Sequence, residues 1–94
     1  MNNGHKVKES DIKRSIRQYL TCNKWFVINI FQTLGCAPGI ADLFAIRNGR
    51  GVWIEVKTAT GRQSDKQKEF QKNIEHHGGI YIIARSIDDL KVIE

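Results

Sequence analysis

Long apolar runs are missing from this sequence. No stretch of about 18 apolar residues occurs, which is the length that a membrane-spanning helix needs. The first ten residues, MNNGHKVKES, also lack the apolar core of a signal peptide. We therefore expect a cytoplasmic protein with no membrane partner, whose polar residues 1–7 are frayed and flexible.

Cysteine is scarce. Cys22 and Cys36 are isolated, without a CxxC pair, and a reducing compartment would keep both as free thiols. The three histidines, His5, His76 and His77, do not form a zinc-binding spacing with them. Internal repeats, linkers and a separate base-reading module such as a zinc finger are also missing, so we expect no strong sequence specificity.

The 94 residues suffice for one domain, 1–94, which buries only about two-thirds of the surface of its unfolded chain. Lysine and arginine outnumber aspartate and glutamate by 15 to 10, which gives a net charge of +5. This charge suits a polyanionic partner, although many small basic proteins bind none. Charge alone therefore does not identify the partner.

Residues 39–57 have the pattern of a β-hairpin. The halves DLFAIR (42–47) and VWIEVK (52–57) are rich in β-branched and aromatic residues. The connection Asn-Gly-Arg-Gly (48–51) supplies residues that tolerate positive φ, as hairpin turns require. The pattern predicts two antiparallel strands.

Two registers of this hairpin are possible, and both bring the same side chains together. A turn at 48–49 places Asp42 opposite Glu55, whereas a turn at 49–50 places Asp42 opposite Lys57. Because side chains alternate, all three share one face in either register, with Cβ atoms roughly 5 to 8 Å apart. Only an odd register, such as a bulge, would separate them.

Two converging carboxylates repel each other unless a positive charge lies between them. A divalent cation that prefers oxygen ligands meets this need, so Asp42 and Glu55 predict a metal site. The ammonium group of Lys57 could hold a water or a phosphate oxygen beside the metal, which suits phosphodiester hydrolysis. The alternative is that Glu55 and Lys57 lie on a solvated sheet face and Asp42 merely ends a loop.

The amino-terminal part predicts a helix and then a strand. Ile12, Ile16, Tyr19 and Leu20 recur at helical spacing between residues 8 and 22. Glu9, in the first turn of this helix, either favours the positive end of the helix dipole or adds a third carboxylate to the metal site. Residues 24–32 predict a mostly buried strand, and residues 33–41 a loop that leads to Asp42.

The carboxy-terminal part predicts a helix, a strand and a final short helix. Ser64-Asp65-Lys66-Gln67 fits a capping box that opens a helix through about His77, and this suffices to explain Gln67. Gln67 could instead orient a water or phosphate at the metal site. Residues 80–85 predict a strand interior to the sheet, because they are apolar on both faces. Leu90 and Val92 could dock the final helix.

These elements predict an α/β fold in the order α-β-β-β-α-β-α, a mixed four-stranded sheet flanked by helices. This order and several motifs resemble the VRR-NUC family of the PD-(D/E)XK nuclease superfamily. The resemblance runs from Glu9 to Leu90, and the segments that carry it are ESDIKRSIRQYL, GIADLFAI, VWIEVKT, SDKQKEF and GGIYIIARSIDDL. One departure is Ala41, where the superfamily has a proline. We expect activity to survive it, because proline restricts the backbone and ligates nothing.

The resemblance implies a Mg²⁺- or Mn²⁺-dependent endonuclease with a restriction-endonuclease-like core. Asp42, Glu55 and the Val56 carbonyl would bind the metal, and Glu9 would complete the site. Lys57 would position or activate the attacking water, with help from Gln67. Cleavage would leave a 5′-phosphate and a 3′-hydroxyl, and we expect the DNA phosphates to be contacted by basic residues such as Lys13, Arg14, Arg17, Arg62 and Lys66.

A chain of this domain alone resembles the stand-alone, phage-associated members of the family, which would place it in a bacterial or phage-infected cell. Those members are similar in architecture to Holliday-junction resolvases, so we expect branched DNA and a C2 homodimer with two sites. Trp25, Phe26 or Trp53 could supply interface surface or simply fill the core. A general nicking or flap nuclease and a non-catalytic DNA-binding module are the competing functions.

Overall fold

In the computed structural model, which describes residues 7–33 and 35–94, the order of elements follows the sequence-based expectation. The carboxy-terminal helix is a 3-10 helix, η1. The elements are α1 (Glu9–Cys22), β1 (Phe26–Asn29), β2 (Leu43–Arg47), β3 (Arg50–Val56), α2 (Asp65–His76), β4 (Ile80–Ala84) and η1 (Ile87–Ile93).

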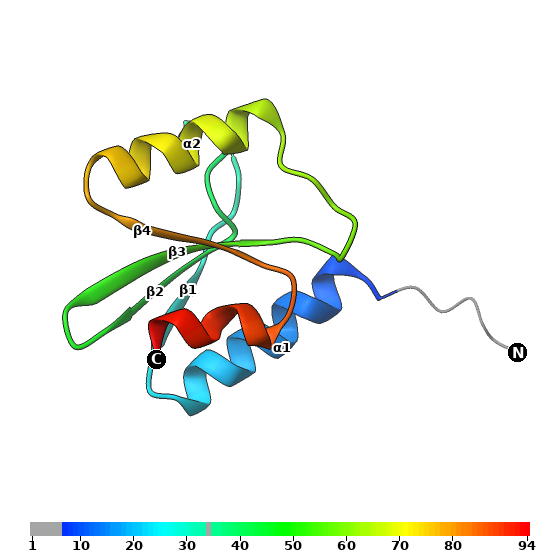
Figure 1. Ribbon diagram of the computed structural model, residues 1–94, viewed down its shortest axis with the longest axis vertical. Helices are drawn as coiled ribbons and strands as arrows, with labels where there is room; N and C mark the ends of the chain where they lie inside the picture. Colours follow the sequence, from blue (N-terminus) through cyan, green and yellow to red (C-terminus); the bar gives the residue numbers. More distant parts are fainter. Residues whose placement is uncertain (1–6, 34) are drawn as a thin grey trace, which may run out of the picture.

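The strands form one mixed sheet in the order β1-β2-β3-β4. β1, β2 and β3 are antiparallel neighbours, whereas β4 runs parallel to β3. Parallel neighbours need a crossover connection, and α2 provides it. Figure 1 shows α2 on one side of the sheet, with α1 and the red carboxy-terminal η1 on the other. The expected fold class is thus confirmed.

The β2–β3 hairpin adopts the first of the two expected registers. Arg47 pairs with Arg50 across a two-residue turn. Asn48 and Gly49 both have positive φ, at 54° and 78°. This conformation is that of a type I′ turn, whose twist matches that of the strands. Local turn chemistry and the alternation of apolar residues therefore agree on one pairing.

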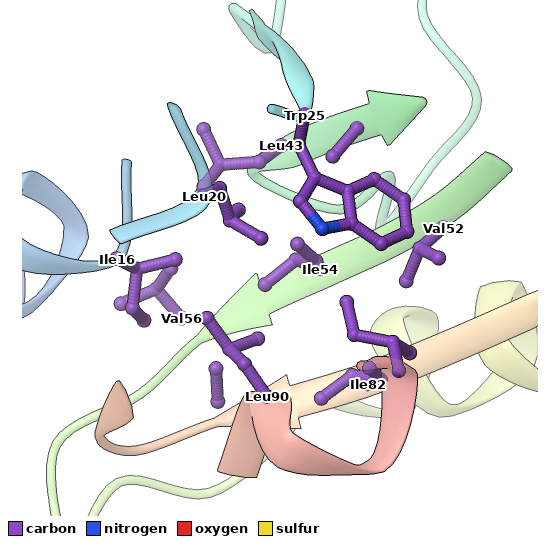
Figure 2. Close-up of a cluster of buried hydrophobic side chains, with 12 residues drawn as sticks. Ile16, Leu20, Trp25, Leu43, Val52, Ile54, Val56, Ile82 and Leu90 are labelled. Carbon is purple, nitrogen blue, oxygen red and sulfur yellow. The ribbon is translucent and has the colours of Figure 1, made fainter. Parts of the chain in front are cut away.

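The main core lies between the sheet and the helices α1 and η1 (Figure 2). Side chains of α1 and η1 meet alternate residues of β2 and β3, and each fully buried aliphatic side chain contributes about 1.5–3 kcal/mol. The buried members are Ile16, Leu20, Trp25, Leu43, Ala45, Val52, Ile54, Val56, Ile82, Ala84, Leu90 and Ile93. Trp25 is therefore a core residue rather than interface surface.

A smaller core lies under α2 on the other face, where Ala41, Phe70 and Tyr81 are buried. Trp53 packs against this cluster, with its ring centroid 4.8 Å from that of Phe44 and 5.3 Å from that of Phe70. Glu55 follows Trp53 by two residues on β3, so the carboxylate faces the α2 side. The site is thus built on the face with the thinner apolar layer.

The first strand is shorter and more exposed than the sequence predicts. It covers Phe26–Asn29 rather than residues 24–32, and Phe26 and Ile28 are 65% and 42% exposed. The expectation of a mostly buried strand is wrong. α2 packs on β4, at the opposite edge of the sheet. This face of β1 therefore lacks a covering helix.

The position expected for β4 is also wrong. β4 pairs with β3 and is an edge strand, not an interior one. Its two faces are apolar because α2 packs on one and η1 on the other. Two apolar faces therefore indicate that helices cover both sides of a strand, and they do not distinguish an edge strand from an interior one.

Of the segment 1–7 that the sequence predicts to be frayed, only Val7 lies within the described residues. Among the helices of residues 7–33 and 35–94, none combines the length and apolar character needed to cross a membrane.

Replacement of Leu90 by alanine should lower the free energy of unfolding by about 2–5 kcal/mol, because Leu90 is fully buried in the main core. Val92→Ala is the matched control in the same helix. Val92 is 75% exposed, contrary to the expectation that it docks η1, and Ile93 is buried instead. Chemical denaturation should find the control within about 0.5 kcal/mol of the parent. Equal effects would contradict this packing.

Candidate active site

Asp42 lies at a bend immediately before β2. Its N–H donates to the Ile54 carbonyl (3.1 Å), so the chain bulges where the ladder with β3 ends. Its carboxylate nevertheless stays on β3, because Oδ2 accepts a hydrogen bond from the Val56 N–H at 2.8 Å. The side chain of Asp42 thus accepts the hydrogen bond from β3 that a backbone carbonyl would accept in a regular ladder.

Glu55 is the one buried charged residue in the described part of the chain, with 1% of its surface exposed. Its two oxygens are in different environments. Oε2 accepts a hydrogen bond from Gln67 Nε2 at 2.8 Å and lies 3.5 Å from Lys57 Nζ. Oε1 is buried with no hydrogen-bond partner among the described residues. One oxygen is therefore fixed, and the other is free to bind a ligand.

The environment of Glu55 raises the pKa of its carboxyl group from 4.5 to about 7. Burial is the largest cause, because it removes the charged form from water. The neighbouring Asp42 carboxylate raises the pKa further, while the Lys57 ammonium group opposes both effects. The site therefore lacks positive charge for two carboxylates.

Gln67 has the capping role that the sequence predicts and a contact with Glu55 that it did not reveal; the orientation of a water or phosphate by Gln67 stays a prediction. Its Oε1 accepts from the Ser64 N–H (2.9 Å), and its own N–H donates to Ser64 Oγ (3.1 Å), which completes the capping box. With Oε1 committed to the cap, the amide NH₂ of Gln67 faces Glu55. The same side chain therefore starts α2 and fixes one oxygen of the acid.

The loop before Asp42 is pressed against the start of α2. Gly39 has φ of +73°, and a Cβ atom there would clash with the carbonyl group of Lys66 and lie 2.6 Å from the Gln67 nitrogen. This contact is possible only for glycine, because the backbone of α2 leaves no room for a side chain. The contact holds the loop that precedes Asp42 against the first turn of α2, which contains Gln67.

Arg85 supports the segment that follows Lys57, a role that the sequence did not reveal. Its guanidinium group donates to the carbonyls of Thr58 (2.6 Å) and Gly61 (2.7 Å). Gly61 in turn packs beside the Lys57 side chain. The only signal in the sequence was a positive residue at the end of an apolar strand.

Tyr81 is a second residue that sequence reasoning missed. It lies opposite Trp53 on the adjacent parallel strand, and its hydroxyl accepts from Gln63 Nε2 at 3.3 Å. Burial, and then the charge of Glu55, raise the pKa of Tyr81 to about 12. Tyr81 therefore keeps its proton and stays an uncharged neighbour of Glu55. Only knowledge that β4 pairs with β3 could have found it.

The acidic residues fit a divalent cation with oxygen ligands. Glu55 Oε1 is a buried acceptor without a donor, and the Asp42 carboxylate beside it raises the local negative charge. The Val56 carbonyl leaves the strand on the same side as its N–H, which is the side of Asp42. Residues 7–33 and 35–94 contain no group of three His, Cys, Asp or Glu side chains placed to bind a metal, so Glu9 does not join this pair. Its role as a ligand stays a prediction.

The basic residues expected to contact DNA lie in two places. Arg62 precedes α2 and Lys66 lies in its first turn, next to Gln67. Lys13, Arg14 and Arg17 lie on α1, which packs on the opposite face of the sheet from Glu55. Lys66 therefore belongs to the helix on the Glu55 face of the sheet, and Arg62 to the segment that leads into it. DNA contacts by all five stay predictions.

No protein-family profile matches the sequence, and the search of curated proteins also found no match. A comparison with solved structures finds a similar fold in a protein described as a "VRR_NUC domain protein". The two structures superimpose with a TM-score of 0.73 over 95% of this chain and 86% of that one, at 18% sequence identity. The chain therefore has the fold of a VRR-NUC domain.

Gly39→Ala should destabilise the protein more than Gly35→Ala does. Both glycines have positive φ, so each alanine adds about 1–2 kcal/mol of backbone strain. Only Gly39 also meets the backbone of α2, whereas a Cβ at Gly35 meets nothing within 4 Å. Thermal unfolding would measure the difference, and NMR should show the Gln67 amide shifted in the Gly39 variant alone. Equal stability losses would contradict the close contact.

The metal-free protein should lose stability as the pH rises through about 7, because of Glu55. In the folded state its pKa is raised, so between 4.5 and about 7 the folded protein holds a proton that the unfolded chain has released. This contribution to stability is complete below the unfolded pKa and disappears above the folded one. Denaturation in EDTA at several pH values, with Glu55→Gln as the control, should find the fall in the parent only.

Proposed function

We propose that this protein is a metal-dependent endodeoxyribonuclease that cleaves branched DNA, including four-way junctions. The observation that carries the proposal is the buried Glu55 carboxylate, which has one oxygen held by Gln67 and Lys57 and the other unpaired beside Asp42. A structural acid would have partners for both oxygens. An acid that binds a cation needs one free.

In this proposal Asp42, Glu55 and the Val56 carbonyl hold a Mg²⁺ or Mn²⁺ ion. The ion, when bound, would neutralise charge on the scissile phosphate and make a water more acidic. Lys57 supplies part of the positive charge that the pair of acids needs, and its ammonium group would hold a phosphate oxygen or the attacking water. Gln67 keeps Glu55 from rotating away.

DNA fits as the substrate because its phosphates complement a protein of net charge +5. Such contacts supply affinity without reading sequence. Lys66 is next in sequence to Gln67, which hydrogen-bonds Glu55, and Arg62 lies in the segment that leads into the same helix. We assign preference for branched DNA to a C2 homodimer, in which two copies of the site make paired nicks. A cytoplasmic protein of a bacterium or phage-infected cell would meet such junctions.

The decisive assay incubates the protein with Mg²⁺ or Mn²⁺ and a four-way junction, a flap, a linear duplex or a single strand. Asp42→Asn should reduce cleavage by more than about 100-fold while DNA binding is retained, because a metal ligand is lost but no phosphate contact is. Asp88→Asn makes the same chemical change at an exposed position in η1 and should cut like the parent.

Each outcome of this assay has a distinct meaning. Paired symmetric nicks confined to the junction would support resolution, with 5′-phosphate and 3′-hydroxyl ends. Cuts spread over flaps or linear DNA would keep the site but make the protein a general nuclease. DNA binding that is equal in EDTA and Ca²⁺, with no cleavage of any substrate, would overturn the proposal in favour of a binding module.

A further inference from the structure

The outer edge of the sheet at β1 is apolar and uncovered. Phe26, Ile28 and Ile46 are exposed large hydrophobic residues on adjacent positions of β1 and β2, on the same face of the sheet. We call these three residues the β1 patch. α2 packs at the other edge, on β4, so no described helix covers the patch. A contiguous patch of this kind marks an interaction surface.

The β1 edge also lacks the features that normally prevent an edge strand from pairing with another chain. In native proteins these features are charged side chains, prolines or bulges at the edge. β1 has no charged residue, no proline and no bulge. Residues 25–41 contain no charged side chain, although 27% of the chain is charged. Such a surface has no charge to attract a phosphate backbone, whereas another apolar, uncharged strand would complement it.

The backbone of β1 has unpaired groups on its outer side. Ile30 donates its N–H to the Asp42 carbonyl, so by alternation Phe26 and Ile28 also direct their backbone groups toward β2. Val27 and Asn29 then direct theirs to the free edge. These backbone groups are free to pair with a further strand.

We propose that β1 pairs antiparallel with β1 of a second copy of this chain, about a two-fold axis at Ile28. A two-fold axis makes any strand complementary to itself in the antiparallel sense. In this register Ile28 lies opposite Ile28 of the other copy, and Phe26 lies opposite Ile30. The patch thus meets an identical apolar patch, and two chains of net charge +5 approach through their charge-free segment.

This pairing has a consequence for the proposed nuclease, on which its biological meaning rests. The two sheets join into one, and both pairs of Asp42 and Glu55 face the same side of it. With strands about 4.8 Å apart and about 3.4 Å per residue along them, the two sites lie roughly 24 Å apart. Two sites on one face, related by a two-fold axis, suit paired cuts in a symmetric junction.

The test measures the oligomeric state by sedimentation over a range of protein concentrations, in EDTA and without DNA. Ile28→Lys should raise the dissociation constant of the dimer by about tenfold or more, because two ammonium groups would face each other directly at the axis. Val92→Lys adds the same charge at an exposed valine on η1 and should leave the constant unchanged. A monomeric parent, or equal constants for both variants, would overturn the proposal.

Cysteine cross-linking tests the register in a background with serine at positions 22 and 36. Ile28→Cys should form an intermolecular disulfide on mild oxidation, since directly opposed residues have Cα atoms about 4.5–5.5 Å apart. Phe26→Cys should not, because the two copies of residue 26 would be roughly 13 Å apart along the strands. Cross-linking of Phe26→Cys as efficient as that of Ile28→Cys would overturn this register.

The two proposals can fail separately. A dimer that depends on Ile28 but cuts no DNA would support the proposed interface and overturn the proposed nuclease function. Metal-dependent cleavage by a parent protein that stays monomeric would support the nuclease function and overturn the interface. If both hold, Ile28→Lys should still nick junctions but lose the coincidence of the two cuts, with circular dichroism confirming its fold.

Discussion

A carboxylate placed in the interior of a small sheet is the constraint on which this structure depends. Glu55 is almost fully buried, and a buried charge is costly unless other groups stabilise it. Lys57 and the Gln67 amide both stabilise the same oxygen, while Asp42 beside it has the opposite effect. The raised pKa of Glu55 shows that its negative charge is only partly compensated. A cation at the unpaired oxygen would compensate the remainder.

Much of the fold near the site serves to hold these few groups in place. Gly39 lets the loop before Asp42 press on the first turn of α2, and the capping box fixes Gln67 in that turn. Arg85 fastens the segment after Lys57 through two carbonyls. Each support comes from a different element, so the geometry of the site depends on the whole α2 face.

Among the described residues, Glu55 Oε1 is a buried acceptor without a hydrogen-bond partner, and it belongs to the acidic pair at the proposed metal position. Buried polar atoms are rarely left unpaired in native proteins. The same principle applies to the backbone of β1, whose outer groups have no partner strand. The proposed cation and the proposed second chain would each supply a missing partner.

The sequence by itself determined the features that depend on near neighbours along the chain. Alternation in the hairpin predicted that Asp42, Glu55 and Lys57 converge, and the Asn48-Gly49 turn was one of the two it allowed. The capping pattern predicted the start of α2. These signals have periods of two to four residues, so local chemistry is enough to read them.

Only the tertiary structure decided which distant elements meet. It placed β4 at the edge beside β3, which brought Tyr81 and Arg85 to the site, and it left β1 uncovered although its sequence predicted burial. It also showed that Gln67 caps a helix and binds Glu55 at once. These contacts depend on how the helices pack on the sheet. The spacing of apolar residues indicates that a residue is buried, but it does not indicate which element covers that residue.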